Sequence, residues 1–142
     1  MRSTKSGFLA LLAVASTLPL PLTADDSETS ASGTDAVASE ATLRRGRIMF
    51  LQCRACHSTE LDGEHRVGPN LHGLLGASAG SKQDFTYSDA MKESGIVWNN
   101  DTLDTFLTKP TDYVPGTIMV FVGMDKAEDR QALIAFLRSQ TE

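Results

Sequence analysis

The sequence predicts an all-α domain in which a helix at each end flanks long loops. Helical patterns occupy residues 42–52 and the segment from residue 125 onward. Between them, residues 58–86 carry many glycines and little periodicity, and the sequence shows neither a convincing strand pair nor an internal repeat. A long loop inside a compact domain usually needs something to wrap around. The pattern therefore predicts a helical domain built around a bound group.

The first 24 residues have the pattern of a secretory signal peptide. Arg2 and Lys5 precede an apolar run over residues 8–18, and residues 22–24 offer a cleavage site that ends in a small residue. The run is shorter than the roughly 20 residues that a membrane-spanning helix needs. An uncleaved anchor is the alternative. We therefore expect a bacterial, periplasmic protein, or one anchored to the periplasmic face of the inner membrane.

Residues 25–41 are predicted to be a flexible acidic linker. They are small and polar and include no aromatic or basic residue, so they cannot bury enough surface to offset the entropy lost on ordering. The whole chain has 13 basic and 18 acidic residues. Five of the acids lie in the linker, which leaves residues 42–142, the predicted domain, with 11 basic and 13 acidic residues. This mildly acidic domain has no basic patch for nucleic acid, and we expect no such partner.

The first and last helices are predicted from their ends and their apolar spacing. Thr42 is the expected cap of the first helix. Gly46 lies inside that helix, where glycine costs up to ~1 kcal/mol relative to alanine, which suggests that another helix approaches closely. The last helix is expected to begin at Asp125, with Glu128 completing a weak capping box. Its apolar stripe consists of Leu133, Ile134 and Leu137.

Two shorter helices are predicted between these ends. Residues 88–94 form a short helix that begins at Ser88 and ends at Gly95. Residues 100–108 form another, with its apolar residues on one face, and Lys109-Pro110 ends it.

The chain's two cysteines lie in the run Cys53-Arg54-Ala55-Cys56-His57. A C-x-x-C-H run is typical of covalent haem attachment, in which two thiols add to the haem vinyl groups and the histidine binds iron. On a helical turn these three side chains share a face and can meet one porphyrin. A structural zinc site would need four ligands, and a second cysteine pair is missing. A thioredoxin-like dithiol remains open, but the adjoining His57 and the predicted export signal favour haem c.

A six-coordinate electron carrier needs a second axial ligand besides His57, usually methionine or histidine. The candidates after the motif are His65, His72, Met91, Met119 and Met124. Both histidines lie in a polar loop, where an ordinary hydrogen-bonding role is the simpler interpretation. Methionines most often fill cores. The turn at Pro115-Gly116 could present Met119 inward, which favours it modestly over the others.

From Gly46 to Gln140 the chain resembles class I cytochrome c of the mitochondrial and bacterial c2 kind. The resemblance rests on five segments in order and on the closing helix: GRIMFLQCRACH, VGPNLHGLLG, FTYSDA, GIVW and YVPGTIMVFVGM. It implies the cytochrome c fold, with crossing terminal helices and with short helices and long loops around one covalent haem c. It also implies an electron carrier rather than an enzyme, cycling between Fe(II) and Fe(III).

The resemblance further implies partners. They are a bc1-type complex as donor and a terminal oxidase or photosynthetic reaction centre as acceptor. We expect a monomer that contacts membranes only through such complexes or through an uncleaved N-terminus. The alternative functions are a membrane-tethered cytochrome c domain and a peroxidase-like enzyme whose Met119 dissociates from the iron.

The resemblance also assigns roles to residues. Met119 matches the methionine that binds iron, opposite His57. Pro69 matches a proline whose carbonyl orients the ligand histidine. Tyr87, Ser88 and Trp98 match residues that hydrogen-bond the haem propionates, and Thr117 matches one near the inner propionate. Gly46 and Phe50 match residues of the first helix that contact the last one, here at Leu133 and Phe136.

The chain departs from the family at positions near the haem. Phe106 stands where many members have a tyrosine against the ligand methionine, Met91 where many have an asparagine, and Ala77 where many have an arginine. The changes at Phe106 and Ala77 predict a reduction potential below that of mitochondrial relatives. At positions where mitochondrial members carry lysines around the haem edge, this chain has Gln52, Thr111, Asp112 and Ile118. Weak salt dependence of docking is expected as a result.

Overall fold

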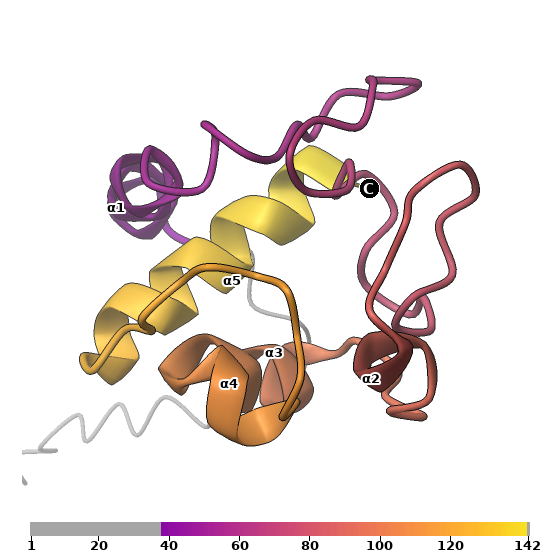
Figure 1. Ribbon diagram of the computed structural model, residues 1–142. Helices are drawn as coiled ribbons and strands as arrows, with labels where there is room; N and C mark the ends of the chain where they lie inside the picture. The colour runs from indigo at the N-terminus through magenta and orange to yellow at the C-terminus, as the bar shows by residue number, and fades with distance from the viewer. Residues whose placement is uncertain (1–37, 142) are drawn as a thin grey trace, which may run out of the picture. The chain divides into compact units, whose positions relative to one another are not determined.

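The computed structural model describes residues 38–141. The predicted signal peptide, residues 1–24, and most of the predicted linker, residues 25–41, lie outside the described residues. The elements in order are α1 (Glu40–Phe50), α2 (Asp89–Lys92), α3 (Asn100–Thr108), α4 (Pro110–Tyr113) and α5 (Ala127–Thr141) (Figure 1). Within the described residues the only β-type pairing is one isolated bridge between Ser78 and Val97. The predicted all-α class is confirmed.

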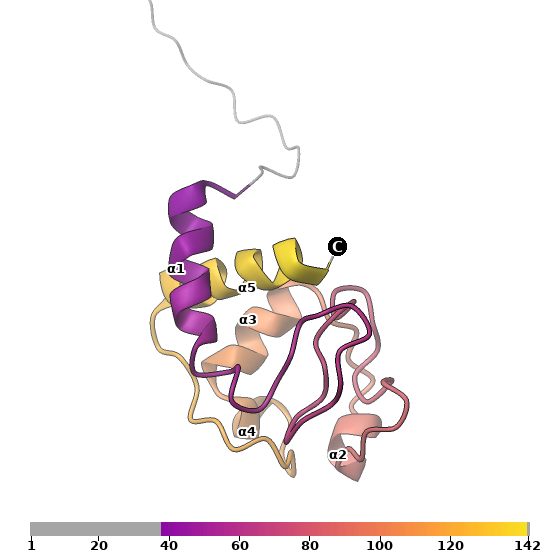
Figure 2. The ribbon, with the colours of Figure 1, turned by 90° about the horizontal axis from the view of Figure 1, so that it is seen from above.

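The crossing of α1 and α5 organises the domain (Figure 2). Gly46 is buried at the crossing, and a Cβ on it would lie 2.0 Å from the Ala132 carbonyl oxygen and 2.6 Å from Phe136 Cβ. Phe50, one turn further along α1, packs on Phe136 with 5.4 Å between the ring centroids. Leu133 is fully buried beside them. The close approach expected at Gly46 is therefore present, and it explains the glycine inside a helix.

Two predicted helix caps are wrong. Ser39 caps α1, since its side chain accepts a hydrogen bond from the Thr42 amide at 3.2 Å, so Thr42 lies inside the helix. α5 begins at Ala127, and Asp125 precedes its first turn. The Met124 amide donates to the Leu107 carbonyl at 2.8 Å. This bond holds the chain along α3 and delays the start of α5.

The two middle helices follow the sequence more closely. Ser88 caps α2, accepting from the Met91 amide at 3.3 Å. α3 spans the predicted residues and has a capping box between Asn99 and Thr102. Pro110 ends the helical run as expected but also begins α4, which was not predicted. Proline is well suited to a first helical position because its missing N–H would be unpaired there.

The described residues include no helix that is both long enough and apolar enough to cross a lipid bilayer. The core is built around α5, which packs against both α1 and α3, and partly buried residues of the loops pack against it. Loops after α1 and around α2 therefore have one wall of helices to fold against, and this arrangement leaves room between loops and helices for the site.

Candidate haem site

A cavity of about 240 Å³ lies between the loops and the helical wall. Its lining includes every residue that the sequence assigned to the site: Cys53, Cys56, His57, Pro69, Tyr87, Ser88, Trp98, Thr117 and Met119. They come from the turn after α1, the loops on either side of α2 and the segment between α4 and α5. Residues up to 66 positions apart in the sequence thus meet at one cavity, although most of them lie in loops.

The cysteines and the histidine lie on a single helical turn after α1. The His57 amide donates to the Cys53 carbonyl at 2.9 Å, and the Cys56 amide donates to the same oxygen at 3.0 Å. Both thiols are free and half-buried. Burial, and to a lesser degree the neighbouring Cys56, raises the pKa of Cys53 to about 11. A thioredoxin-like dithiol needs a lowered thiol pKa, so this alternative is disfavoured.

A metal site made of protein side chains alone also finds no support. Across residues 38–141, no group of three or more His, Cys, Asp or Glu side chains is arranged to hold a metal ion. The structural zinc alternative therefore lacks the ligands that it would need.

His57 is held in the orientation that a metal ligand requires. Its Nδ1 lies 2.7 Å from the Pro69 carbonyl oxygen. A carbonyl can only accept, so Nδ1 carries the proton and Nε2 keeps its lone pair. Burial lowers the pKa of His57, and the hydrogen bond to Pro69 opposes this effect only in part. The imidazole is therefore neutral at pH 7, with one nitrogen available to bind iron.

Gly68 is a site residue that the sequence analysis missed. It is buried, and a Cβ on it would lie 2.3 Å from His57 Cε1 and 2.8 Å from each ring nitrogen. Its amide donates to the Cys56 carbonyl at 2.8 Å. The backbone of Gly68 thus packs directly on the imidazole, and no other residue type leaves room for the ring. Its position immediately before Pro69 was the available signal.

The cavity separates the five candidates for the second ligand. Met91 and Met119 line it, whereas Met124 is buried elsewhere in the core. Both ring nitrogens of His65 already have hydrogen-bond partners in the loops. Its Nδ1 accepts from the Asn70 amide at 2.9 Å, and its Nε2 lies 2.8 Å from the Gln83 carbonyl oxygen. His72 does not line the cavity either. Two methionines therefore remain, one on α2 and one in the loop before α5.

The predicted propionate partners lie around the same cavity. Trp98 is buried, and one neighbouring loop holds its backbone: the Gly76 amide donates to the Trp98 carbonyl at 2.8 Å, and the Trp98 amide donates to the Ala77 carbonyl at 2.9 Å. Burial raises the pKa of Tyr87, so its hydroxyl stays protonated and can donate. The Thr117 hydroxyl accepts from the Met119 amide at 3.3 Å. This bond helps to fix the loop that carries Met119.

The departures from the family also face the cavity. Ala77, Met91 and Phe106 all line it. Phe106 is buried against Trp98 with 5.1 Å between the ring centroids. Three positions where many relatives place a polar or charged group are therefore apolar in this cavity wall.

The residues present fit a haem. Two free thiols and the imidazole of His57 lie on one turn, the buried Gly68 backbone leaves space for the ring, and two methionines line the same cavity. A haem covalently attached there supplies reversible one-electron chemistry. The chain's contribution is attachment, orientation and exclusion of water by apolar walls.

Comparison with known proteins agrees with this site. The family model described as cytochrome c matches residues 43–141. Cytochrome c of Gibberella zeae is 46% identical over 101 residues, covering 70% of this chain and 95% of that protein. Cytochrome c of Stellaria longipes is 43% identical over 104 residues, 72% of this chain and 96% of that one. Cytochrome c2 of Rhodomicrobium vannielii is 46% identical over 96 residues, 68% of this chain and 77% of that one.

The comparisons contradict the periplasmic location, and with it the inner-membrane anchor, that residues 1–24 predicted. Most of the similar proteins are eukaryotic cytochromes c, including the two above from Gibberella zeae and Stellaria longipes. Their matches use nearly the whole of each relative but only 70% and 72% of this chain, and the family model begins at residue 43. The signal-like pattern thus has no counterpart in these relatives, and the location drawn from it was wrong.

The family match covers the region that contains every residue of the cavity, including both cysteines and His57. This chain can be aligned with cytochromes c and c2 over more than two thirds of its own length. The chain therefore belongs to the cytochrome c family, as an electron-transfer protein rather than an enzyme, and binds haem c through Cys53 and Cys56.

Proposed function

We propose that His57 and Met119 bind the haem iron on its two faces. The observation that carries this proposal is the orientation of His57, whose Nδ1–H is committed to Pro69 and whose Nε2 is free beside the cavity. Met119 lines the same cavity from a loop fixed by Thr117. With both faces occupied there is no open position for a small molecule, which suits electron transfer rather than peroxidase chemistry.

We further propose that the protein accepts electrons from a bc1-type complex and delivers them to a terminal oxidase or a photosynthetic reaction centre. The resemblance to cytochromes c and c2 supports this choice.

The test is a spectrum of the purified holoprotein with a redox titration, followed by reduction with bc1 complex and oxidation by either acceptor. A methionine–iron charge-transfer band and weak cyanide binding at low concentration are expected. Absence of the band would contradict the assignment of Met119 as an iron ligand. Failure of the protein to be reduced by the bc1 complex or to be oxidised by either acceptor would contradict the proposed partners.

Phe106→Tyr is expected to raise the reduction potential. Phe106 and Met119 line the same cavity, and the resemblance to the family implies that a hydroxyl at position 106 would donate to the Met119 sulfur. This bond would reduce electron donation by the sulfur and favour Fe(II). A hydrogen bond worth about 0.5–1.5 kcal/mol corresponds to roughly 20–65 mV in a one-electron couple. Redox titration measures the shift. Phe85→Tyr is the control, since Phe85 lines the cavity but packs on Tyr87 at 4.7 Å. An equal shift in both variants would contradict the argument.

Electron delivery is expected to depend weakly on salt. Ile118 and Val120 line the cavity and are also largely exposed, so apolar side chains border its mouth. Lys109 is paired with Asp112 at 2.8 Å, which offsets its charge locally. Steering by a strongly charged face gives effects of about 10- to 1000-fold on association rates. Oxidation by a mitochondrial-type oxidase should therefore change less than about tenfold between low and physiological salt.

Ile118→Lys is the matched test of this explanation. It restores one positive charge at the cavity mouth and should steepen the salt dependence. A wild-type rate that already falls steeply with salt would show that the apolar border does not govern docking.

A further inference from the structure

The segment that carries Met119 is a loop with both ends attached to α3. It leaves α3 through Lys109 and the short α4. At the other end the Met124 amide donates to the Leu107 carbonyl at 2.8 Å. Gly123 has φ +104° and passes so close to α3 that a Cβ on it would lie 2.1 Å from the Thr108 carbonyl oxygen. Residues 109–124 therefore form a closed loop whose two ends meet at the end of α3.

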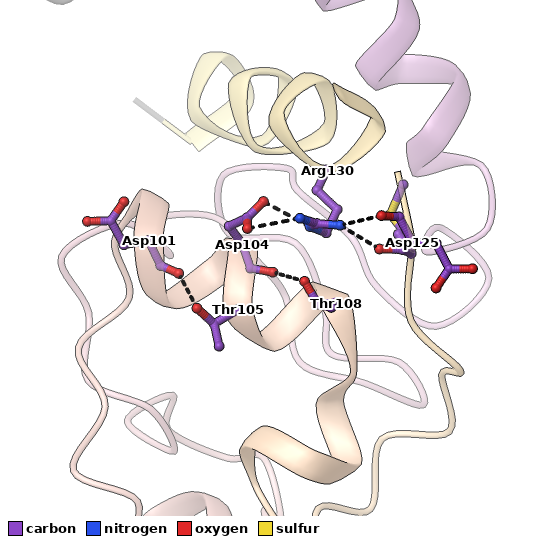
Figure 3. A network of polar contacts seen from close by, with 7 residues as sticks. Asp101, Asp104, Thr105, Thr108, Asp125 and Arg130 are labelled. Carbon is purple, nitrogen blue, oxygen red and sulfur yellow. Dashed lines mark hydrogen bonds and ion pairs between the residues drawn. The ribbon is translucent and has the colours of Figure 1, made fainter. Parts of the chain in front are cut away.

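Arg130, in the first turns of α5, binds the chain where this loop ends, at Met124 and Asp125 (Figure 3). Its Nη1 donates to the Met124 carbonyl at 2.8 Å and to the Asp125 carbonyl at 2.9 Å. Its Nε and Nη2 donate to the two carboxylate oxygens of Asp104 on α3, at 2.9 and 3.1 Å. The Arg130 side chain is only 9% exposed. One guanidinium thus joins the loop, α3 and α5, and its two-pronged ion pair fixes its plane.

The same part of α3 forms the cavity wall. Leu103, Phe106 and Leu107 line the cavity, and the Leu107 carbonyl holds Met124. Any movement that withdraws Met119 from the cavity by lifting the loop end must break the Leu107 bond and the bonds from Arg130 to Met124 and Asp125. Asp104 raises the energy of that movement, because it keeps the guanidinium in the position from which both carbonyls are bound.

We propose that Arg130, oriented by Asp104, is a positioning residue that keeps the 109–124 loop closed and so sets how often Met119 leaves the cavity. The functional consequence of this proposal rests on the proposed role of Met119 as an iron ligand. The clamp itself depends only on protein contacts. Local opening of a loop can have a smaller free energy than global unfolding, so the clamp acts on loop opening separately from overall stability.

The chain offers a matched control. Arg45 on α1 pairs with Asp129 on α5 through Nε and Oδ1 at 2.6 Å. This is also an arginine–aspartate pair that joins α5 to another helix. It connects α5 to α1, however, and makes no contact with the 109–124 loop. Asp104→Asn and Asp129→Asn therefore each remove one negative charge from an arginine–aspartate pair of α5. The first pair is the two-pronged one at the clamp, and the second is a more exposed, single contact away from it, where Glu128 also lies 3.9 Å from Arg45.

The experiment compares both variants and Arg130→Lys, as holoproteins, by three measurements. Hydrogen exchange of the Met124 amide reports loop opening, exchange in the middle of α5 reports global unfolding, and imidazole binding followed by absorption reports release of Met119. In Asp104→Asn we expect exchange at Met124 and imidazole binding to increase roughly 10- to 100-fold, the factor for loss of a hydrogen bond to a charged group. Arg130→Lys keeps the positive charge but loses the two parallel hydrogen bonds to Asp104. Exchange at Met124 and imidazole binding are expected to increase in this variant too.

Asp129→Asn is expected to leave Met124 exchange and imidazole binding unchanged, apart from any part that follows global exchange in α5. The proposal is overturned if Asp104→Asn and Asp129→Asn raise loop exchange equally, or if loop exchange in Asp104→Asn rises only in step with α5. If the wild-type holoprotein lacks a methionine–iron band, the assignment of Met119 fails, while exchange at Met124 still decides whether the clamp exists.

Discussion

Gly46→Ala is expected to lower the free energy of unfolding by about 3 kcal/mol or more, which is at or above the usual upper range for overpacking a core. The added Cβ would lie 2.0 Å from the Ala132 carbonyl oxygen, and a backbone atom cannot rotate away as a side chain could. Alanine inside a helix would otherwise be favoured over glycine by up to ~1 kcal/mol. The contact with α5 therefore has to outweigh a gain in helix propensity. Denaturant unfolding of the holoprotein measures the difference.

Arg47→Ala is the control for Gly46→Ala. Arg47 is exposed on the same helix, so the new alanine there meets no neighbour, and a change within about 0.5 kcal/mol is expected. If Gly46→Ala were as stable as the wild type, α1 and α5 would have to lie further apart than the structure places them. The crossing matters for the site as well, because Phe50 on α1 and Leu133 on α5 both line the cavity.

What the sequence predicted well was local or had a specific spacing. Cys53, Cys56 and His57 lie on one turn because an i, i+3, i+4 pattern is set by helix geometry alone. Gly46 indicated a helix contact because glycine inside a helix is costly without one. The bounds of α3 followed from its apolar face and from the proline after it.

What the sequence did not predict depends on residues distant in the chain. Gly68 is needed because the ring of His57 lies against it, and only the folded loop brings the two together. Asp104 and Arg130 are 26 positions apart and look like ordinary surface charges until α3 and α5 pack. The start of α5 was misplaced for a similar reason, since the hydrogen bond from Met124 to Leu107 holds the chain against α3 before α5 begins. From the residues alone five candidates remained for the second ligand, and the cavity reduces them to two.

Met119→Leu is expected to abolish the methionine–iron charge-transfer band and to open the iron to external ligands. Leucine keeps the apolar bulk at the half-buried site but has no sulfur. A ligand-competent minor state is typically populated at about 0.1–10%, and the apparent affinity for a competing ligand is reduced by that fraction. Removing the competition should therefore raise imidazole or cyanide affinity roughly 10- to 1000-fold. Absorption titration of the ferric holoprotein measures both effects.

Met91→Leu is the matched variant, because Met91 also lines the cavity but belongs to α2. We expect it to keep the band and to bind external ligands as weakly as the wild type. The opposite result, with the band lost in Met91→Leu and kept in Met119→Leu, would assign the second ligand to α2. Arg130 would then still close the 109–124 loop, but that loop would carry no iron ligand. The pair of variants thus decides which methionine binds iron and whether the loop's closure bears on electron transfer.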